Sequence, residues 1–324
     1  MKALTHRILI IGTTPNALNS NWALRKHAAT GFSEAKPAAT IRECAWDEAY
    51  NAIDQFRPTL VIWMGGVMLQ EYDLSLATHL ARTVGSKVIF WMHDDPYELD
   101  VSLSIVELAD FIFTTDKASQ IHYPPNIPSF HLPLAACPYT HVRSITQRTG
   151  PEWFFCGVPF PCRTFFFTQV QKHGLDKKGL LLGPQWNLEK INSAADIPVS
   201  SGQIANYYST ARSVIYLGRD TDLANERFKV KPSTPGPRLF EAAMAGACQI
   251  ALTPGLEIAE YFELESELIL IDGVNDFSLV LSQLEVEPSL SEKIGKAAQE
   301  RALKSHTYKH RALELIKQFE EAIV

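Results

Sequence analysis

The stretch Ser233–Gly255, STPGPRLFEAAMAGACQIALTPG, contains a complete helix–strand unit. Pro237 stands where a helix would begin and Gly246 just past its end, the asymmetry typical of helix termini. The apolar run Cys248–Leu252 follows and predicts a buried strand. Because the helix is short and rich in alanine, its backbone can approach a sheet closely. The stretch therefore predicts one α/β repeat of a larger sheet.

Two charged side chains on this helix indicate an anion site. Arg238 lies in the first turn, where the backbone N–H groups and the helix dipole already favour a phosphate. Glu241 lies among small apolar residues and can accept hydrogen bonds from sugar hydroxyls. A capped core helix with an exposed glutamate would fit the same residues, so the rest of the chain must decide.

The composition favours a two-domain globular protein. The chain has 324 residues, 46% of them hydrophobic, and domains usually have roughly 150 residues. Its net charge of −6 gives no basic stripe for a phosphate backbone, so we expect no nucleic-acid partner. The five scattered cysteines form no CxxC pair, which argues against structural zinc and a disulfide framework. Reduced thiols favour a cytoplasmic protein.

Neither a secretory signal nor a membrane span is predicted. The apolar run near the start of the chain, Ile8–Ile11, is too short for either. The longest apolar run, Leu60–Met68, contains two glycines and is interpreted as a buried strand with its turn. Peripheral attachment to a membrane through a surface helix stays open.

Apolar strands alternate with helices along the first half of the chain. Continuous apolar strands separated by helices indicate a parallel sheet covered on both faces. The proline-rich residues 124–138 are predicted to lack regular structure, and the polar run His141–Gly150 to link two domains. The predicted strands are Arg7–Ile11, Thr59–Met64, Lys87–Met92 and Asp110–Thr114; the predicted helices are Ser20–Ala29, Trp46–Phe56, Tyr72–Val84 and one beginning at Asp95-Pro96.

A second half repeats this plan, which predicts two Rossmann-like α/β domains whose parallel sheets face a central cleft. Ligands of such sheets bind beyond the carboxyl ends of the strands, so one half would hold a nucleotide and the other an acceptor. The domains are predicted at residues 1–145 and 146–305. The further strands are Trp153–Cys156, Gly179–Leu182, Ser213–Leu217 and Glu267–Ile271; the further helices are Arg163–His173, Ala205–Ala211, Ser289–Lys304 and Tyr308–Ile323.

The loops after the strands carry candidate binding residues. Glycine after a strand lets the backbone turn tightly or approach a ligand. Arg163 is a candidate phosphate contact or a solvated helix start, and Trp186 a nucleobase contact or a core residue. The segment Gly218–Gly236 is too long for an ordinary connection and is interpreted as a mobile flap over the donor site. The complete set of binding candidates on these loops is Gly12, Thr13, Gly157, Arg163, Gly183, Trp186, Arg219 and Gly236.

The candidate catalytic residues are His93, Asp94 and Asp95, which directly follow a buried strand. An acceptor hydroxyl needs an imidazole or a carboxylate as its base or hydrogen-bond partner. Alternatively, Asp95-Pro96 is a helix cap followed by proline at the first helical position, and His93 is a packed ring.

In ordered pieces the chain resembles a bacterial GT-B glycosyltransferase of the spore-maturation-protein-B-like group. The pieces of the first half are Ile8–Gly12, Trp22, FWMHDDP (Phe90–Pro96) and FHLPLA (Phe130–Ala135). Those of the second half are FFCGVPFPCR (Phe154–Arg163), LLLGPQW (Leu180–Trp186), Tyr207–Leu217, PRLFEAAMAGA (Pro237–Ala247), YFELESELILI (Tyr261–Ile271) and SHTYKHRA (Ser305–Ala312).

The resemblance implies transfer of a sugar from a nucleoside-diphosphate sugar, a UDP-sugar rather than a GDP-sugar, to an acceptor. The acceptor is a saccharide, a lipid-linked glycan, a protein or a small molecule. In the related group-1 transferases the glutamate matched by Glu241 binds the ribose, and Arg238 would take the diphosphate. Ser233 stands where those proteins have a glutamate that contacts the donor sugar. The helix at residues 306–324 would cross back to the first domain.

Three alternatives to this function and chemistry remain. Adjacent carboxylates also hold metal in GT-A transferases, but the repeated α/β plan argues against that fold, so no metal and no other cofactor is expected. A nucleotide-sugar 2-epimerase of the same fold would act on the donor alone. A non-catalytic nucleotide-sugar-binding protein would keep the cleft without the chemistry, and Ser233 supports that alternative.

Overall fold

The computed structural model describes residues 6–16, 21–66, 71–145, 147–187, 191–195, 197 and 199–322, without the side chains of residues 71–73. These residues belong to two compact units. The first unit comprises Met1–Leu134, Asp222–Thr234 and Tyr308–Val324, and the second Ala135–Thr221 and Pro235–Thr307. The structural division thus falls between Leu134 and Ala135, whereas we predicted it at residue 145.

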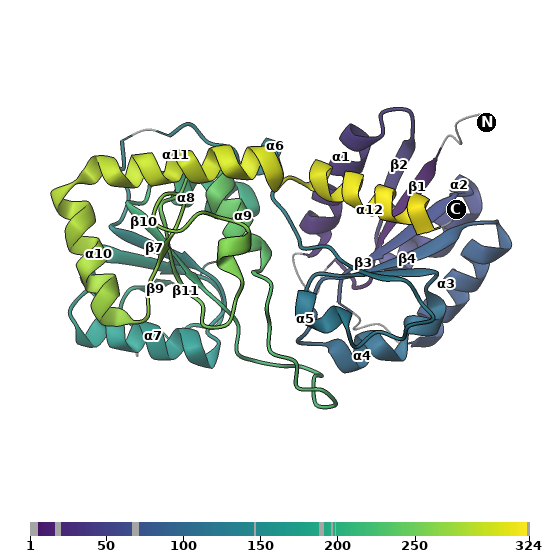
Figure 1. Cartoon of the computed structure of the whole chain (residues 1–324), viewed down its shortest axis with the longest axis horizontal. Coiled ribbons are helices and arrows are strands. Elements are labelled where there is room, and N and C mark those ends of the chain that lie inside the picture. The colour runs from purple at the N-terminus through teal and green to yellow at the C-terminus, as the bar shows by residue number, and fades with distance from the viewer. Residues whose placement is uncertain are drawn as a thin grey trace. The chain divides into compact units, whose positions relative to one another are not determined.

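The first unit is a parallel sheet between layers of helices (Figure 1). In sheet order its strands are β2 (Thr40–Cys44), β1 (Arg7–Gly12), β3 (Leu60–Met64), β4 (Lys87–Met92), β5 (Phe111–Thr114) and β6 (Ser129–His131). Helices α2 (Ala49–Phe56), α3 (Glu71–Thr83) and α4 (Leu99–Ser104) pack on one face, and α1 (Asn21–Ala35) and α12 (Tyr308–Ala322) cover the other. The short helix α5 (Lys117–Gln120) follows β5.

The second unit has the same plan. In sheet order its strands are β12 (Ile269–Leu270), β11 (Gln249–Leu252), β10 (Ser213–Leu217), β7 (Trp153–Cys156), β8 (Gly179–Leu182) and β9 (Ala194–Ala195), all parallel. Helices α8 (Ser201–Thr210) and α9 (Pro237–Met244) pack on one face, and α7 (Pro161–Lys172) and α10 (Val274–Val286) on the other. Helix α11 (Pro288–Ser305) lies against α9, and α6 (Pro138–His141) precedes β7 (Figure 1).

The predicted strands are confirmed, with small shifts at their ends, because their continuous apolar runs are buried in the sheets. The prediction that residues 124–138 lack regular structure is wrong, since β6 pairs with β5 there. Prolines flank this edge strand without interrupting it. β2, with the sequence TIREC, was missed because its exposed edge position tolerates charged side chains. Ser20, the first residue of one predicted helix, lies outside the described residues.

The interpretation of His141–Gly150 as a linker is wrong, because arginines anchor this segment within the second unit. Arg143 donates hydrogen bonds to the carbonyl of Gly202 and the side chain of Asn206. Arg148 donates to three backbone carbonyls, those of Ser209, Gly246 and Ser291. A polar sequence looks like a linker when its partners lie far along the chain.

Helix α11 packs through Gly295 against Gly246, which lies just beyond the end of α9. A Cβ on Gly295 would overlap the carbonyl oxygen of Gly246 and lie 2.5 Å from Arg148. We expect Gly295→Ala to lower the stability of the protein by about 1–3 kcal/mol, the usual cost of overpacking, and to lower Tm measurably by calorimetry. Gly202→Ala is the matched control, since its Cβ would meet its nearest atom at 3.9 Å. Equal Tm values for the two variants would contradict this account of the helix contact.

Candidate active site

The start of helix α9 is fixed at the carboxyl end of β10. Gly236 is the N-cap, and its N–H donates a hydrogen bond to the hydroxyl of Tyr216 at 2.7 Å. Pro237 follows at the first helical position, as predicted. The first turn of the helix therefore opens at the strand ends, where ligands of parallel sheets bind.

Arg238 and Glu241 form an ion pair on this helix. An Arg238 guanidinium nitrogen donates to Glu241 Oε2 at 2.8 Å. The Arg238 side chain is 40% exposed, whereas that of Glu241 is only 4% exposed. The arginine thus presents positive charge to solvent in front of a buried carboxylate. The alternative of a helix with an exposed glutamate is wrong.

The loop after β7 approaches the end of β8 through two predicted glycines. Gly183 has φ of +145°, and a Cβ on it would overlap the carbonyl oxygen of Gly157. The indole N–H of Trp186 donates to the same oxygen at 2.7 Å. Trp186 is 4% exposed and packs edge-on against Phe155. The structure therefore places this tryptophan in the core, where it supports the glycine loop.

Two further predicted arginines lie at the ends of β7 and β10. Arg163 donates to the carbonyls of Val158, Leu217 and Gly218. Its guanidinium and that of Arg219 lie 4.6 Å and 5.1 Å from the centre of the Phe160 ring. Arg163 joins the loops of two strands, and Arg219 stacks beside it. The structure thus gathers the second-unit candidates at one edge of their sheet.

In the first unit, the ends of β1, β3 and β4 meet around His93. The hydroxyl of Thr13 donates to the carbonyl of Gly66. Gly65 has φ of +142°, and a Cβ there would overlap Thr13 and lie 3.2 Å from His93 Nε2. Gly65 and Gly66 are needed because the ends of three strands converge here. The sequence alone showed only that two glycines follow β3. Gly12, at the end of β1, lies over the guanidinium of the buried Arg25.

His93 has the properties of a proton acceptor. Its side chain is 3% exposed, and neither ring nitrogen has a hydrogen-bond partner among the described residues. Burial lowers its pKa, against the opposing effect of Asp94, so the ring is neutral near pH 7. Asp94 Oδ2 lies 3.7 Å from His93 Nε2, and the Asp94 side chain is 31% exposed. Asp94 is thus the solvent-accessible partner of a buried imidazole.

Asp95 does not cap a helix, contrary to the alternative drawn from Asp95-Pro96. Helix α4 begins only at Leu99, and the Asp95-Pro96 peptide bond is cis. Asp95 is 4% exposed and accepts hydrogen bonds from the hydroxyls of Ser102, Thr114 and Tyr123 at 2.6–2.7 Å. These bonds join α4 to β5 inside the unit. The structure therefore places this candidate in the interior of the first unit, among hydroxyl donors.

Burial raises the pKa of Asp95 from 3.8 to about 6, although three hydroxyl donors oppose the shift. The folded protein then binds this proton more tightly than the unfolded chain does, so stability falls as pH rises from 3.8 to about 6. Asparagine does not titrate, so the Asp95→Asn variant lacks this pH dependence. We expect Asp95→Asn to gain stability relative to the native protein by roughly 2 kcal/mol between pH 4 and pH 7. Urea unfolding at both pH values measures this difference, and a constant difference would contradict the pKa shift.

Ser233, which stands at the position of a family glutamate, is bound within the first unit. Its N–H and hydroxyl both donate to Asp116 Oδ2, at 2.7 and 3.1 Å, and the N–H of Thr234 donates to the same oxygen. The Ser233 hydroxyl in turn accepts from the N–H of Ala118. The Asp116 carboxylate, which sequence reasoning missed, therefore holds the end of the segment predicted to be a flap.

The middle of that segment is also bonded to the first unit. Asp100 accepts hydrogen bonds from the N–H groups of Glu226 and Arg227. The N–H groups of Leu223 and Ala224 donate to the carbonyl of Tyr97. Its backbone between Leu223 and Thr234 is thus bonded to the first unit, and the interpretation as a mobile flap is not supported by these contacts.

Comparison with known proteins gives one family match and several similar proteins. Residues 163–317 match the family described as glycosyl transferase-like. The chain is also 25% identical to the spore protein CgeB of Bacillus subtilis (strain 168) over 252 residues, which span 71% of this chain and 73% of CgeB. The predicted resemblance is confirmed.

Solved structures share the architecture of this chain. Alr3699/HepE of Anabaena, in complex with UDP and glucose, aligns with a TM-score of 0.65 at 9% identity, over 97% of this chain and 99% of HepE. A putative UDP-N-acetylglucosamine 2-epimerase of Listeria monocytogenes aligns with a TM-score of 0.56 at 12% identity, over 98% of this chain and 97% of the epimerase. The predicted two-domain α/β architecture of the GT-B fold is confirmed.

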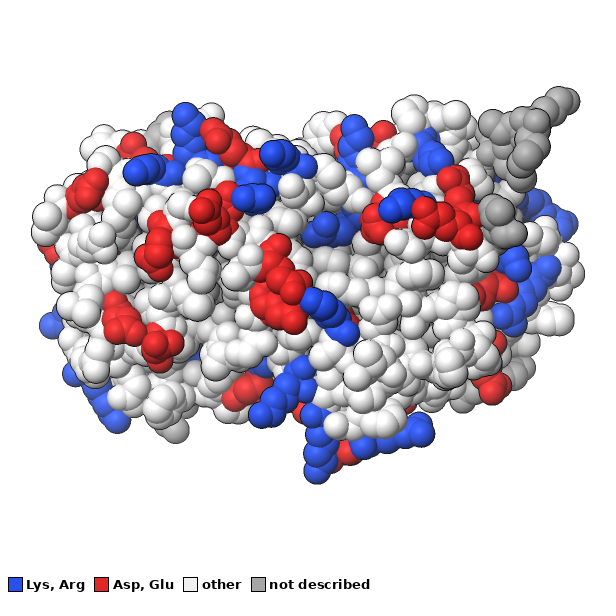
Figure 2. Space-filling model, viewed as in Figure 1, with Lys and Arg blue, Asp and Glu red and all other residues white. Residues whose placement is uncertain are grey.

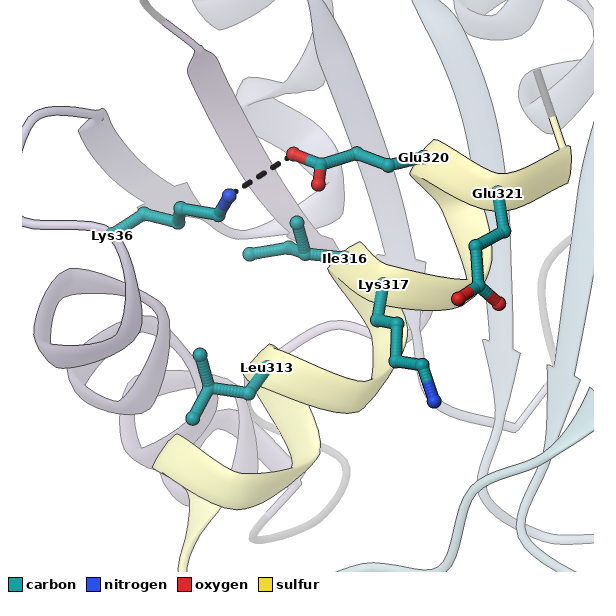
Figure 3. A pocket seen from close by; sticks show the side chains of 6 residues that line it. All are labelled: Lys36, Leu313, Ile316, Lys317, Glu320 and Glu321. Atoms are coloured by element: carbon teal, nitrogen blue, oxygen red, sulfur yellow. Dashed lines mark hydrogen bonds and ion pairs between the residues drawn. The ribbon is translucent and has the colours of Figure 1, made fainter. Parts of the chain in front are cut away.

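Other surface features contain none of the candidate residues. A pocket of about 570 Å³ opens beside α12, whose Leu313 and Ile316 point into it, while Lys36 and Glu320 form an ion pair at 3.0 Å across it (Figure 3). Acidic and basic side chains are interspersed on the face shown in Figure 2. In the described residues, neither a three-residue metal-binding group nor a helix able to span a membrane is found.

Proposed function

We propose that this protein transfers a sugar from a nucleoside-diphosphate sugar, most readily a UDP-sugar, to a hydroxyl group of an acceptor. The observation that carries the proposal is the pair on α9, a half-exposed Arg238 in front of a buried Glu241. The glycosyl transferase-like match includes both residues. HepE, which shares the fold, was crystallised with UDP and glucose. These findings support nucleotide-sugar binding in the second unit.

In this proposal the start of α9 binds the diphosphate. Arg238 and the backbone N–H groups of the first turn neutralise its charge, which the helix dipole also favours. Glu241 accepts hydrogen bonds from the ribose hydroxyls. Gly157 and Gly183 let the loop backbone approach the nucleotide, and Arg163 and Trp186 hold those loops in place. These donors supply the positive charge without a metal ion or another cofactor.

The first unit activates the acceptor. As the acceptor oxygen bonds to the anomeric carbon of the sugar, the bond from that carbon to the diphosphate oxygen breaks. The acceptor proton passes to His93, whose neutral ring lacks a hydrogen-bond partner among the described residues. Arg238 and the α9 terminus stabilise the charge on the departing nucleoside diphosphate. Asp94 is the alternative base because its side chain is more exposed than that of His93.

The cysteine thiols support a cytoplasmic location for this reaction. All five cysteines lie among the described residues and are free, which fits a reducing compartment. We propose that the acceptor is a saccharide, a lipid-linked glycan, a protein or a small molecule presented there.

A screen of nucleotides tests the donor assignment. Thermal shifts with UDP, GDP, TDP and ADP, and then with their sugar conjugates, should rank UDP compounds first, because a ligand that binds only the folded state raises Tm. Release of UDP from the selected donor in the presence of candidate acceptors then measures transfer. Absence of binding to every nucleotide would overturn the proposal.

A nucleotide-sugar 2-epimerase is the second candidate function, because the Listeria epimerase shares the fold. Such an enzyme converts the donor without an acceptor. Proton NMR of UDP-N-acetylglucosamine incubated with the protein alone distinguishes the two. A new sugar epimer would favour the epimerase, and an unchanged donor that reacts only with an acceptor would favour the transferase.

A further inference from the structure

His141 lies behind Glu241 and has no role in the function proposed above. It ends the short helix α6 and is 1% exposed. Its Nε2 lies 3.8 Å from Glu241 Oε1, on the carboxylate oxygen opposite the one bound by Arg238. Nothing local in the sequence marks it, because it is separated from Glu241 by a long stretch of chain.

The hydrogen bond at the other nitrogen fixes the proton on this ring. The backbone N–H of Cys137 points at His141 Nδ1 at 3.0 Å. The Cys137 carbonyl oxygen also lies 3.1 Å from Nδ1, but it already accepts from the N–H groups of Thr140 and His141. We therefore assign Nδ1 as the acceptor of the Cys137 N–H, which can only donate. Burial lowers the pKa of His141, although Glu241 opposes the shift, so the ring is neutral. Its single N–H is therefore at Nε2 and faces Glu241.

Arg238 and His141, which both lie beside Glu241, differ in their freedom to move. The Arg238 side chain is 40% exposed, so its guanidinium can turn toward a ligand. The His141 side chain is 1% exposed and is fixed by Cys137. A carboxylate as buried as Glu241 needs a compensating donor when its arginine turns away.

We propose that His141 is a positioning residue for the nucleotide site. Its Nε2–H holds one oxygen of Glu241 while Arg238 turns to the diphosphate, which leaves the other oxygen for the ribose hydroxyls. This inference rests on the proposed binding of a nucleoside diphosphate and names a residue that the binding requires.

Two substitutions separate this role from a merely structural one. In His141→Asn the side-chain oxygen replaces Nδ1 as the acceptor for the Cys137 N–H, but the donor facing Glu241 is lost. In His141→Gln the side-chain nitrogen replaces Nε2, and the Cys137 contact is lost. If His141 acts through Glu241, His141→Asn weakens UDP binding and His141→Gln preserves it. A purely structural role through Cys137 gives the opposite order.

Calorimetric titration with UDP and with 2′,3′-dideoxy-UDP provides the readout. We expect His141→Asn to weaken UDP binding about tenfold, the usual scale for one lost partner of a buried carboxylate, with dideoxy-UDP affinity unchanged. His141→Gln should bind UDP like the native protein. In a Glu241→Ala background, His141→Asn should have no further effect.

Two results would overturn the inference while leaving the donor site intact. One is an equal loss of affinity for UDP and dideoxy-UDP in His141→Asn. The other is an unchanged UDP affinity in His141→Asn when Glu241→Ala selectively weakens UDP binding. Failure of the native protein to bind UDP would instead overturn the proposed function, and this inference with it. Thermal unfolding of each variant shows whether it is folded. If His141→Asn is not folded, His141→Gln, alone and combined with Glu241→Ala, decides between the two roles.

Discussion

Replacing Arg238 by alanine is expected to weaken UDP binding by about 100-fold. Charge-assisted hydrogen bonds to the diphosphate contribute about 1.5–3 kcal/mol, and alanine also removes the ion-pair partner of Glu241, whose side chain is 4% exposed. A buried charge that loses its partner is strongly destabilising, so the variant should also have a lower Tm. Isothermal titration with UDP measures the first effect and calorimetry the second.

Two matched variants define what the Arg238 result means. Arg238→Lys keeps the charge but not the guanidinium geometry, so an intermediate affinity is expected. Arg163→Ala removes an arginine that donates to three backbone carbonyls. Its main expected effect is therefore a lower Tm, with only a small loss of UDP affinity. If Arg238→Ala bound UDP as tightly as the native protein, the diphosphate site would not lie at the start of α9.

Replacing His93 by phenylalanine is expected to lower the rate of sugar transfer by about 100- to 10,000-fold, the usual contribution of a general base. UDP affinity should be unchanged, because His93 belongs to the first unit and the nucleotide residues to the second. Because burial lowers the pKa of His93 from 6.5, the native rate should fall only when the pH drops below 6.5. Single-turnover rates across pH, together with UDP titration, measure both effects.

The neighbouring aspartates serve as comparisons for His93. Asp94→Asn keeps the size of the side chain and should reduce the rate less than His93→Phe, since His93 holds the proton in this mechanism. If Asp94→Asn instead abolished transfer while His93→Phe retained it, the base would be Asp94. Asp95→Asn should alter stability and its pH dependence while leaving the transfer step largely intact.

Much of the fold could be predicted because its signals are short in sequence. The strands β3 and β4 are continuous apolar runs, which only a sheet buried on both faces accommodates. Helix α9 begins at Pro237 as predicted, because helix termini are set by neighbouring residues. β2 and β6 were not predicted, since edge strands lack a continuous apolar pattern.

The candidate site could be predicted only where its partners lie on one element. Arg238 and Glu241 are one helical turn apart, so their pairing follows from the sequence. Asp95 was a catalytic candidate with a helix cap as the alternative, and the cap is wrong because Asp-Pro is only a local signal, whereas its three hydroxyl partners come from separate parts of the first unit. The bond of Ser233 to Asp116 spans an even longer stretch of chain.

The sequence by itself determined the α/β repeats, the position of α9 and the residue types at the strand ends, because these depend on contacts within a few residues. Only the tertiary structure decided which of those residues are buried, and with which partners. It placed Trp186 in the core, left His93 without a hydrogen-bond partner among the described residues, and set His141 behind Glu241. Burial and long-range pairing control protonation and charge, and both arise only when distant segments pack together.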